Sequence, residues 1–256
     1  MLVAGVDIGS QTAKAVVMRN QDVVSSHIQP GGVDAEQSAR EVLAVALDKA
    51  GAHMDELDAV VATGYGRISI PFATRQVTEI TCNARGVHHR YPDAKLIIDV
   101  GGQDTKVIRL DGRGRVANFA MNDKCAAGTG RYLEVIAATL GVRIGELGDL
   151  ALRAKEKVKI SSMCTVFAQT EVVSLIARRT RTEDIAAGVH EAIARRIRGL
   201  AASMQIRGET ILTGGVAKNI GFVRALEAEM GTSLVIPEDP QILTALGAAL
   251  MILSAG

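Results

Sequence analysis

The sequence predicts an α/β protein built from two related lobes that face one ligand. The segment VDIGSQTAKAVV at 6–17 matches IDVGGQDTKVIR at 98–109 with an offset of 92 residues, the difference between positions 99 and 7. Each copy is an apolar, β-branched run interrupted by a glycine-rich turn, which is typical of a hairpin whose backbone can approach a ligand closely. Between the copies a helical pattern alternates with a strand-like run, so we expect mixed sheets flanked by helices.

Four identities recur in register between the two copies, and chance seldom aligns so many. They are Asp7 with Asp99, Gly9 with Gly101, Gln11 with Gln103, and Lys14 with Lys106. We therefore expect a first lobe at 1–93 and a second lobe at 94–240, with a C-terminal helix at 241–256 packing back on the first. No linker or low-complexity tract separates the lobes, so we expect them to be tightly coupled.

The first lobe is expected to continue with a helix and a strand. A buried helix is predicted at 39–51, because apolar residues recur at helical spacing before Gly51. These residues are Val42, Leu43, Val45, Ala46 and Leu47. The segment DAVVATGYGR at 58–67 predicts a short buried strand that runs into a glycine loop. Cys82, in TEITCNARGVHH, is expected on a helix as a small core residue.

The second lobe is expected to be mostly helical after its hairpin. Helices are predicted at 131–141, at 164–179 and from Thr182 onward, where two acids in the first turn suit the helix dipole. In that third helix Ile185, Val189, Ile193, Ile197, Leu200 and Met204 recur at helical spacing. The segment ETILTGGVAKN at 209–219 predicts a strand that enters a Gly-Gly turn. Two further helices are expected at 222–231 and from 241.

Composition excludes several classes of protein. The 256 residues are 48% hydrophobic, which is enough to bury a substantial core. The 29 lysines and arginines nearly balance the 28 aspartates and glutamates, so no nucleic acid partner is expected. The longest apolar run, at 245–253, is too short to span a bilayer, and no basic leader precedes Asp7. We therefore expect a cytoplasmic protein without a membrane partner.

Three glycine-rich turns, each after a strand, offer backbone N–H groups that can surround phosphates. Neither a Walker A loop nor the G-x-G-x-x-G of dinucleotide folds occurs, so the signal is the set of turns taken together. Asp7 and Asp99 stand at predicted strand ends and suit Mg²⁺, which binds a few carboxylates, usually through water, together with substrate phosphates. The alternative is that both are turn-forming aspartates in ordinary hairpins.

The chain has three cysteines, Cys82, Cys125 and Cys164. They are too few for a secreted disulfide framework, and an odd number cannot pair completely. Cys125 precedes AAGTG and Cys164 follows ISSM, so each lies near a predicted helix N-terminus, which favours a thiolate or the anionic sulfurs of a cluster. A cubane iron–sulfur cluster normally needs four thiolates, and two chains would supply two each. The alternatives are a disulfide between the two cysteines or two inert buried thiols.

The two hairpins and the Gly-Gly turn resemble the acetate and sugar kinase, Hsp70 and actin superfamily, whose duplicated domains close on ATP. The resemblance implies an actin-like fold with ATP or ADP in the cleft between the lobes. It also implies phosphate contacts from both hairpins and adenosine contacts from the Gly-Gly turn. The implied residues are Gly9, Ser10, Thr12 and Lys14 in the first lobe, Asp99, Gly101, Gly102, Gln103 and Asp104 in the second hairpin, and Gly214, Gly215 and Ala217 at the adenosine.

Five motifs together closely resemble the ATPase activators of 2-hydroxyacyl-CoA dehydratases and the related small ATPase subunits of benzoyl-CoA reductase. They are NDKCAAGTGR, ISSMCTVFAQTEV, IDVGGQDTK, ATGYGR and LTGGVAKN, and the resemblance covers nearly the whole chain. It implies one [4Fe–4S] cluster per dimer, held by Cys125 and Cys164 of each subunit. It also implies that ATP drives a low-potential electron into an iron–sulfur dehydratase or reductase. Gln11 departs from the hydroxyl residue expected in the first phosphate loop.

The same resemblance implies partners and further site residues. The assembly would be a homodimer, or a heterodimer with a related ATPase subunit, with ferredoxin or flavodoxin as electron donor. Gly128, Thr129 and Gly130 lie just after Cys125 and are expected to bind cofactor and to link phosphate sensing to cluster position. The alternative is a helix-starting turn with Thr129 as its cap. The candidates for positioning the attacking water are Asp7, Gln103 and Asp104.

Two rival functions share the predicted fold, and fold alone does not separate them. One is a small-molecule kinase, which would need an acceptor pocket and a base but no iron. The other is an actin-like or chaperone-like module that uses ATP only to switch partners. The discriminating feature is the pair of cysteines at helix starts, which phosphoryl transfer does not require.

Overall fold

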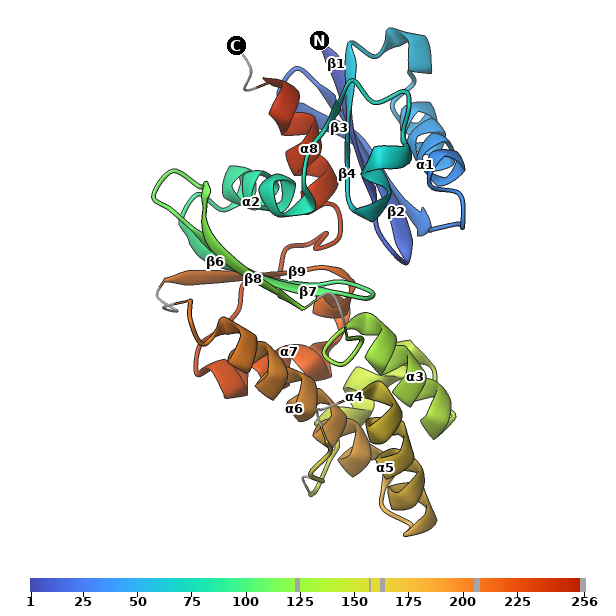
Figure 1. Cartoon of the computed structure of the whole chain (residues 1–256), viewed down its shortest axis with the longest axis vertical. Coiled ribbons are helices and arrows are strands. Elements are labelled where there is room, and N and C mark those ends of the chain that lie inside the picture. The colour runs from blue at the N-terminus through green and yellow to red at the C-terminus, as the bar shows by residue number, and fades with distance from the viewer. Residues whose placement is uncertain (123–124, 157, 162–163, 205–207, 254–256) are drawn as a thin grey trace. The chain divides into compact units, whose positions relative to one another are not determined.

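The computed structural model describes residues 1–122, 125–156, 158–161, 164–204 and 208–253, and it contains two sheets flanked by helices (Figure 1). The chain divides into two compact units. The first comprises Met1–Lys95, Ile108–Ala117 and Gln241–Gly256, and the second comprises Leu96–Val107 and Asn118–Pro240. The lobe boundaries expected at 93 and 240 stay a prediction.

The first unit is built on a five-stranded sheet with the strand order β3-β2-β1-β4-β5. Its strands are β1 (Leu2–Ile8), β2 (Thr12–Arg19), β3 (Asp22–Pro30), β4 (Ala59–Thr63) and β5 (Arg75–Gln76). β1 pairs antiparallel with β2 and parallel with β4. β1 is therefore the central strand, and it is buried along its whole length. Its C-terminal end carries Asp7 between the ends of its two neighbours.

Helices cover both faces of this sheet, because β1 directs successive side chains to opposite sides. Val6 packs in one core with Leu43 of α1 (Ala35–Lys49). Gly5 faces the other side, where a Cβ would overlap the main chain of α8 (Leu243–Leu253). Glycine at position 5 therefore lets α8 lie directly against the sheet.

α8 also packs closely against α2 (Glu79–Arg90) in the first unit (Figure 1). A Cβ at Gly247 of α8 would overlap the carbonyl oxygen of Cys82, and a Cβ at Gly86 of α2 would overlap that of Leu243. The two glycines therefore set how closely these helices approach. Cys82 is fully buried in α2, where it serves as a small core residue of a helix, as the sequence predicts.

The other sheet has the strand order β8-β7-β6-β9. Its strands are β6 (Ala94–Val100), β7 (Thr105–Leu110), β8 (Val116–Asn122) and β9 (Glu209–Thr213). The helices of the second unit are α3 (Gly130–Leu140), α4 (Leu147–Leu152), α5 (Thr165–Ala177), α6 (Thr182–Ala201) and α7 (Ile220–Met230). Ile98, Ile136 and Ile193 belong to the one apolar core that joins this sheet to its helices.

Short 3-10 helices complete the chain: η1 (Met54–Glu56), η2 (Tyr65–Ser69), η3 (Ile144–Glu146) and η4 (Gly215–Lys218). Both predicted hairpins are confirmed as β1–β2 and β6–β7, and the predicted helices and strands exist with slightly shifted ends. The sequence did not predict β3, β8 or α4. No helix in the described part of the chain combines the length and the apolar character needed to cross a bilayer.

Two details of the predicted helices are wrong. Val45 is 38% exposed, because helical geometry carries it off the stripe that Val42, Leu43 and Ala46 direct into the core. Met204 is buried but lies beyond the end of α6 at Ala201. Its side chain therefore reaches the core from the segment that follows the helix.

Candidate functional site

The two hairpin turns are closed by the same backbone hydrogen bond. In the first turn the amide of Gly9 donates to the carbonyl oxygen of Thr12 at 3.1 Å. In the second turn the amide of Gly101 donates to the carbonyl oxygen of Asp104 at 3.0 Å. Both bonds obey the 92-residue offset of the sequence repeat. The repeat therefore encodes one turn geometry twice.

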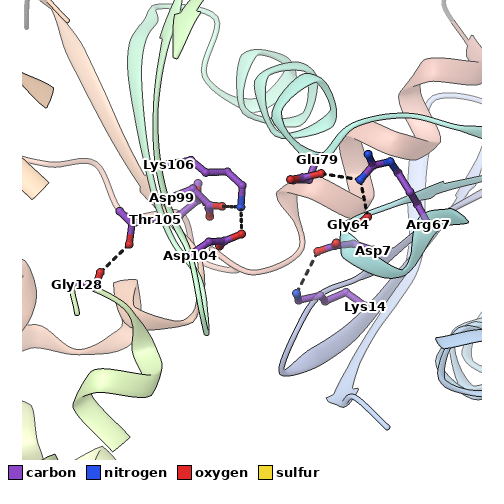
Figure 2. A network of polar contacts seen from close by, with 11 residues as sticks. Asp7, Lys14, Gly64, Arg67, Glu79, Asp99, Asp104, Thr105, Lys106 and Gly128 are labelled. Carbon is purple, nitrogen blue, oxygen red and sulfur yellow. Dashed lines mark hydrogen bonds and ion pairs between the residues drawn. The ribbon is translucent and has the colours of Figure 1, made fainter. Parts of the chain in front are cut away.

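An aspartate and a lysine form an ion pair beside the first turn. Lys14 Nζ donates to Asp7 Oδ2 at 3.1 Å (Figure 2), because the antiparallel register places the two residues directly opposite each other. Both side chains are largely buried. The positive charge of Lys14 therefore already balances the negative charge of Asp7, the carboxylate that was predicted to bind a cation.

The second turn holds a larger network. Lys106 Nζ lies 2.6 Å from Asp104 Oδ2 and 3.8 Å from Asp99 Oδ2, and Thr213 Oγ1 donates to Asp99 Oδ1 at 2.8 Å. Figure 2 shows Lys106 reaching both carboxylates. Since β9 supplies the threonine and the hairpin supplies the other groups, two segments remote in sequence fix the position of Asp99.

A third pair of matching turns follows the strands β4 and β9. Gly64 has φ +83° and Gly214 has φ +88°, and each begins a short 3-10 helix. A Cβ at Gly64 would overlap the carbonyl oxygen of Ile8, and one at Gly214 would overlap that of Val100. Each turn therefore lies against the end of its neighbouring strand, and the left-handed backbone and the close approach both require glycine. Adenosine contacts were predicted for the second of these turns.

The first of these turns is held by an arginine. Arg67 Nη1 donates to the carbonyl oxygen of Gly64 at 2.9 Å and to Glu79 Oε2 at 3.2 Å (Figure 2). Glu79 is the first residue of α2. The loop GYGR is thus a fixed structure and not a plain connection.

The segment after Cys125 bonds directly to the second hairpin turn. The amides of Gly130 and Arg131 donate to the carbonyl oxygens of Gly101 and Gly102 at 2.9 and 2.8 Å. A Cβ at Gly130 would lie 3.2 Å from the carbonyl oxygen of Gly101, so a larger residue here would press tightly on the hairpin turn. The structure therefore brings the predicted residues at 128–130 and 101–102 together.

Thr129 occupies the N-cap position of α3, but its hydroxyl makes no cap bond. It donates instead to the carbonyl oxygen of Ala126 at 2.6 Å. The predicted cap position of Thr129 is confirmed, but its side chain does not make the cap hydrogen bond, because the hydroxyl closes the preceding turn. The backbone amides at the start of α3 are bound by the carbonyl groups of the hairpin turn.

The remaining predicted nucleotide residues differ in exposure. Ser10, Gln103 and Gly215 are exposed, whereas Gly9, Thr12 and Gly214 are half-buried. Ala217 is buried within η4. Of the three candidates for positioning water, Gln103 is exposed, while Asp7 and Asp104 are held by lysines.

Cys125 and Cys164 are free thiols, both half-buried. Cys164 is the N-cap residue of α5, and Cys125 precedes the turn that leads into α3. α3 and α5 pack against each other (Figure 1). Burial raises the pKa of the third thiol, Cys82, to about 12. Within the described residues no group of three or more histidine, cysteine, aspartate or glutamate side chains is arranged to hold a metal ion.

Several residues of this site were not predicted from the sequence: Gly64, Thr105, Lys106, Asn122 and Thr213. Three of them, Lys106, Gly64 and Thr213, carry a signal that could have found them. Lys106 repeats Lys14 in register, and the dipeptide Thr-Gly occurs at the end of both β4 and β9. Thr105 acts through a contact between distant segments, whereas Asn122 bonds to carbonyl groups only three and five residues away.

The comparisons with known proteins extend over nearly the whole chain. Residues 4–251 match the BadF/BadG/BcrA/BcrD ATPase family. The 2-hydroxyisocaproyl-CoA dehydratase activator of Clostridioides difficile is 43% identical over 251 residues, which cover 98% of this chain and 94% of that protein. The activator of lactoyl-CoA dehydratase of Anaerotignum propionicum is 42% identical over 255 residues, which cover 98% and 96%. A benzoyl-CoA reductase subunit of Thauera aromatica is 32% identical over 260 residues, which cover 97% and 92%.

Solved structures agree with these relatives. The activator of the 2-hydroxyisocaproyl-CoA dehydratase from Clostridium difficile, solved with bound ADPNP, aligns with a TM-score of 0.93 and 42% identity, covering 98% of this chain and 94% of that chain. A ROK family glucokinase from Streptomyces griseus aligns with a TM-score of 0.56 and 13% identity, covering 98% and 99%, which is a likeness of fold alone. The predicted actin-like α/β fold and the predicted resemblance to activators and to the benzoyl-CoA reductase subunit are confirmed.

Proposed function

Because the chain belongs to the BadF/BadG/BcrA/BcrD ATPase family, we propose that it is an ATP-dependent reductive activator of an acyl-CoA dehydratase or reductase. When bound, a dimer-bridging [4Fe–4S] cluster would supply the low-potential electron whose transfer ATP hydrolysis drives. Relatives that match almost the whole chain are activators of 2-hydroxyisocaproyl-CoA and lactoyl-CoA dehydratases, and another is a component of benzoyl-CoA reductase.

One observation carries this proposal: the second hairpin turn is hydrogen-bonded to the helix start that follows Cys125. The bonds run from the amides of Gly130 and Arg131 to the carbonyl oxygens of Gly101 and Gly102. If phosphates bind to this turn, as its glycines allow, a change in the phosphates acts on the backbone next to the thiol. Phosphoryl transfer to a small molecule does not require such a connection to a cysteine.

The two half-buried cysteines fit the donor set of the cluster. Both thiols are free and partly exposed, Cys164 is the N-cap residue of α5, and Cys125 precedes the turn that leads into α3. Each chain offers two such thiols, Cys125 and Cys164, and a second chain would complete the four that the cluster needs. Cys82 does not fit, because burial keeps it protonated.

The nucleotide would be ATP or ADP with Mg²⁺. In the first unit the amides of the turn at 9–12 and Lys14 are suited to phosphate, and in the second unit the turn at 101–104 offers the same donors. Asp7 and Asp99 would act on Mg²⁺ through water, because each already has a lysine as neighbour. Mg²⁺ retains several waters readily in such sites. Gly214, Gly215 and Ala217 would contact the adenosine.

Hydrolysis also requires a group that orients the attacking water. Lys106 holds the carboxylate of Asp104 at 2.6 Å, and Lys14 holds that of Asp7 at 3.1 Å. Gln103 follows directly after the two glycines of the turn and is exposed. Among the three candidates, Gln103 therefore has the side chain that is free to meet solvent.

The partners follow from the same proposal. The chain would work as a homodimer, or as a heterodimer with a related ATPase subunit, in the cytoplasm. It would accept electrons from ferredoxin or flavodoxin and pass them to an iron–sulfur dehydratase or reductase component. The acyl-CoA substrate would belong to that component and not to this chain.

The test is activation of a partner enzyme under anaerobic conditions. A 2-hydroxyacyl-CoA dehydratase is mixed with the reduced protein, with and without ATP and Mg²⁺, and product formation is measured. We expect activation that requires ATP, that is lost in Cys125→Ser and Cys164→Ser, and that is retained in the control Cys82→Ala. Undiminished activation by both serine variants would refute the proposal. Phosphorylation of a small-molecule acceptor without activation would identify a kinase instead.

A further inference from the structure

Two side chains tie the Cys125 segment to its surroundings. Asn122 Nδ2 donates to the carbonyl oxygen of Cys125 at 2.9 Å and to that of Ala127 at 3.2 Å. Thr105 Oγ1 donates to the carbonyl oxygen of Gly128 at 2.6 Å (Figure 2). The segment from 125 to 128 is therefore fixed through its carbonyl groups by one amide and one hydroxyl.

Thr105 stands at the junction between the nucleotide turn and this segment. It is the first residue of β7 and directly follows Asp104, whose carbonyl oxygen closes the turn through the amide of Gly101. Its side chain is buried, with a relative exposure of 1%. A displacement of the turn therefore moves the Thr105 hydroxyl, and the buried bond passes that displacement to Gly128.

The segment itself is held together as one unit. Gly128 has φ +97°, a conformation that other residues adopt rarely, and a Cβ there would lie 3.1 Å from Arg196 Cδ. Asn122 bonds to both ends of the short turn between Cys125 and Ala127, so this turn shifts as one body. The hydrogen bonds of Thr105 and Asn122 thus form a continuous connection from Asp104 to the backbone of Cys125.

We propose that Thr105 and Asn122 are positioning residues that transmit the state of the nucleotide at the turn 101–104 to the thiol of Cys125. This inference rests on the proposed function, because it assumes that nucleotide phosphates contact this turn. ATP and ADP would favour different positions of the turn, and the two side chains would convert that difference into different positions of Cys125. Neither residue needs to touch the nucleotide or the cluster.

The test uses the reactivity of Cys125 as its readout and needs no cluster. The full-length protein, purified in air, is treated with iodoacetamide in the presence of ADP, of ADPNP or of neither, and mass spectrometry follows the alkylation of each cysteine peptide. We expect the rate at Cys125 to differ at least about fivefold between ADP and ADPNP, the ratio that one buried hydrogen bond can support. Thr105→Val keeps the shape of the side chain but lacks the donor, and it should reduce this ratio to about one.

Three controls separate coupling from a general structural effect. Thr105→Ser restores the hydroxyl and should restore the ratio, and Asn122→Asp, which cannot donate, should lower it like Thr105→Val. Nucleotide affinity, measured by titration with a fluorescent ADP analogue, should stay within about twofold in all variants. If Thr105→Val fails to fold, the alkylation ratios of Thr105→Ser and Asn122→Asp still test the inference, because the first should match wild type and the second should be lower.

Two outcomes would overturn the inference: a wild-type ratio of one, or a wild-type ratio that survives in both Thr105→Val and Asn122→Asp. The proposed function fails on a different observation, namely the lack of iron in protein purified anaerobically. If protein without iron still shows nucleotide-dependent alkylation of Cys125, the inferred coupling stands and the proposed role in electron transfer fails. The two claims are thus tested separately.

Discussion

Lys106 Nζ lies 2.6 Å from Asp104 Oδ2, and both side chains are more than nine-tenths buried. Asp99 lies 3.8 Å from the same ammonium group. One lysine therefore balances two carboxylates beside the second hairpin turn, as Lys14 balances Asp7 beside the first. This arrangement gives the turn a fixed charge distribution before any ligand binds.

Removal of the buried ammonium group is expected to destabilise the second unit strongly. Lys106→Met would leave Asp104 and Asp99 without their common cation, and such a loss costs about 3 to 5 kcal/mol. Urea unfolding measures the change in the free energy of unfolding. The matched control is Arg143→Met, because the pair of Arg143 with Glu146 is exposed and its loss should change stability little. Similar losses in both variants would contradict the structural role of Lys106.

The three thiols are expected to differ sharply in reactivity. Cys82 is fully buried in α2 and its pKa is raised to about 12, so almost no thiolate is present at pH 8. Iodoacetamide at this pH should modify Cys125 and Cys164 in the cluster-free protein and should reach Cys82 only after denaturation. Peptide mass spectrometry gives the rate for each site. Modification of Cys82 in the folded protein at the rate of the other two would show that the α2–α8 packing is wrong.

Two glycine substitutions are expected to act in opposite directions. Gly247→Ala places a methyl group against the carbonyl of Cys82, and overpacking of this kind costs about 1 to 3 kcal/mol. Gly199→Ala, in the exposed last turns of α6, meets no atom within 4 Å and should stabilise by about 0.5 to 1 kcal/mol. Thermal unfolding of the two variants checks both signs. A stabilising Gly247→Ala would contradict the close packing of α2 and α8.

Acid is expected to weaken the second unit through His190. This side chain is buried in α6, its Nδ1 lies 2.7 Å from the carbonyl oxygen of Ala186, and burial lowers its pKa to about 4. A lowered folded pKa means that the stabilisation is complete above about pH 6.5 and is lost as the pH falls toward 4 and below. At full protonation the loss amounts to about 3 kcal/mol.

The variant His190→Leu isolates this effect, because all carboxyl groups titrate alike in both proteins. The free energy of unfolding of the wild type minus that of the variant should fall as the pH is lowered from about 6.5 to about 4, because only the wild type must protonate His190. Urea unfolding at a series of pH values provides the comparison. A difference that stays constant over this range would show that His190 is not buried in its neutral form.

The hairpins were predictable because the repeat preserves local chemistry. A glycine turn between two apolar runs specifies its own geometry within a few residues, and the bonds from Gly9 to Thr12 and from Gly101 to Asp104 bear this out. The turn at Gly64 was also open to prediction, since its Thr-Gly dipeptide recurs at Gly214. Its glycine is needed for the approach to Ile8, which is a tertiary contact.

The connection between the turn at 101–104 and the segment after Cys125 could not be predicted in the same way. Thr105 and Gly128 are 23 residues apart, and a bond of this kind leaves no period in the sequence. β8 was missed for a related reason: much of it is exposed, so it lacks the apolar alternation that marks a strand. Thr129 shows the opposite case: its cap position could be predicted, but the sequence did not show that its hydroxyl bonds to Ala126.

The proposed function requires that Cys125 and Cys164 of two subunits hold one iron–sulfur cluster. The most direct test is the content of iron and acid-labile sulfide per chain after anaerobic purification, together with the mass of the protein in solution. We expect about two irons per chain in a dimer, lost in Cys125→Ala and in Cys164→Ala and kept in Cys82→Ala. Protein that holds no iron after anaerobic reconstitution, or that keeps its iron in both variants, would contradict it.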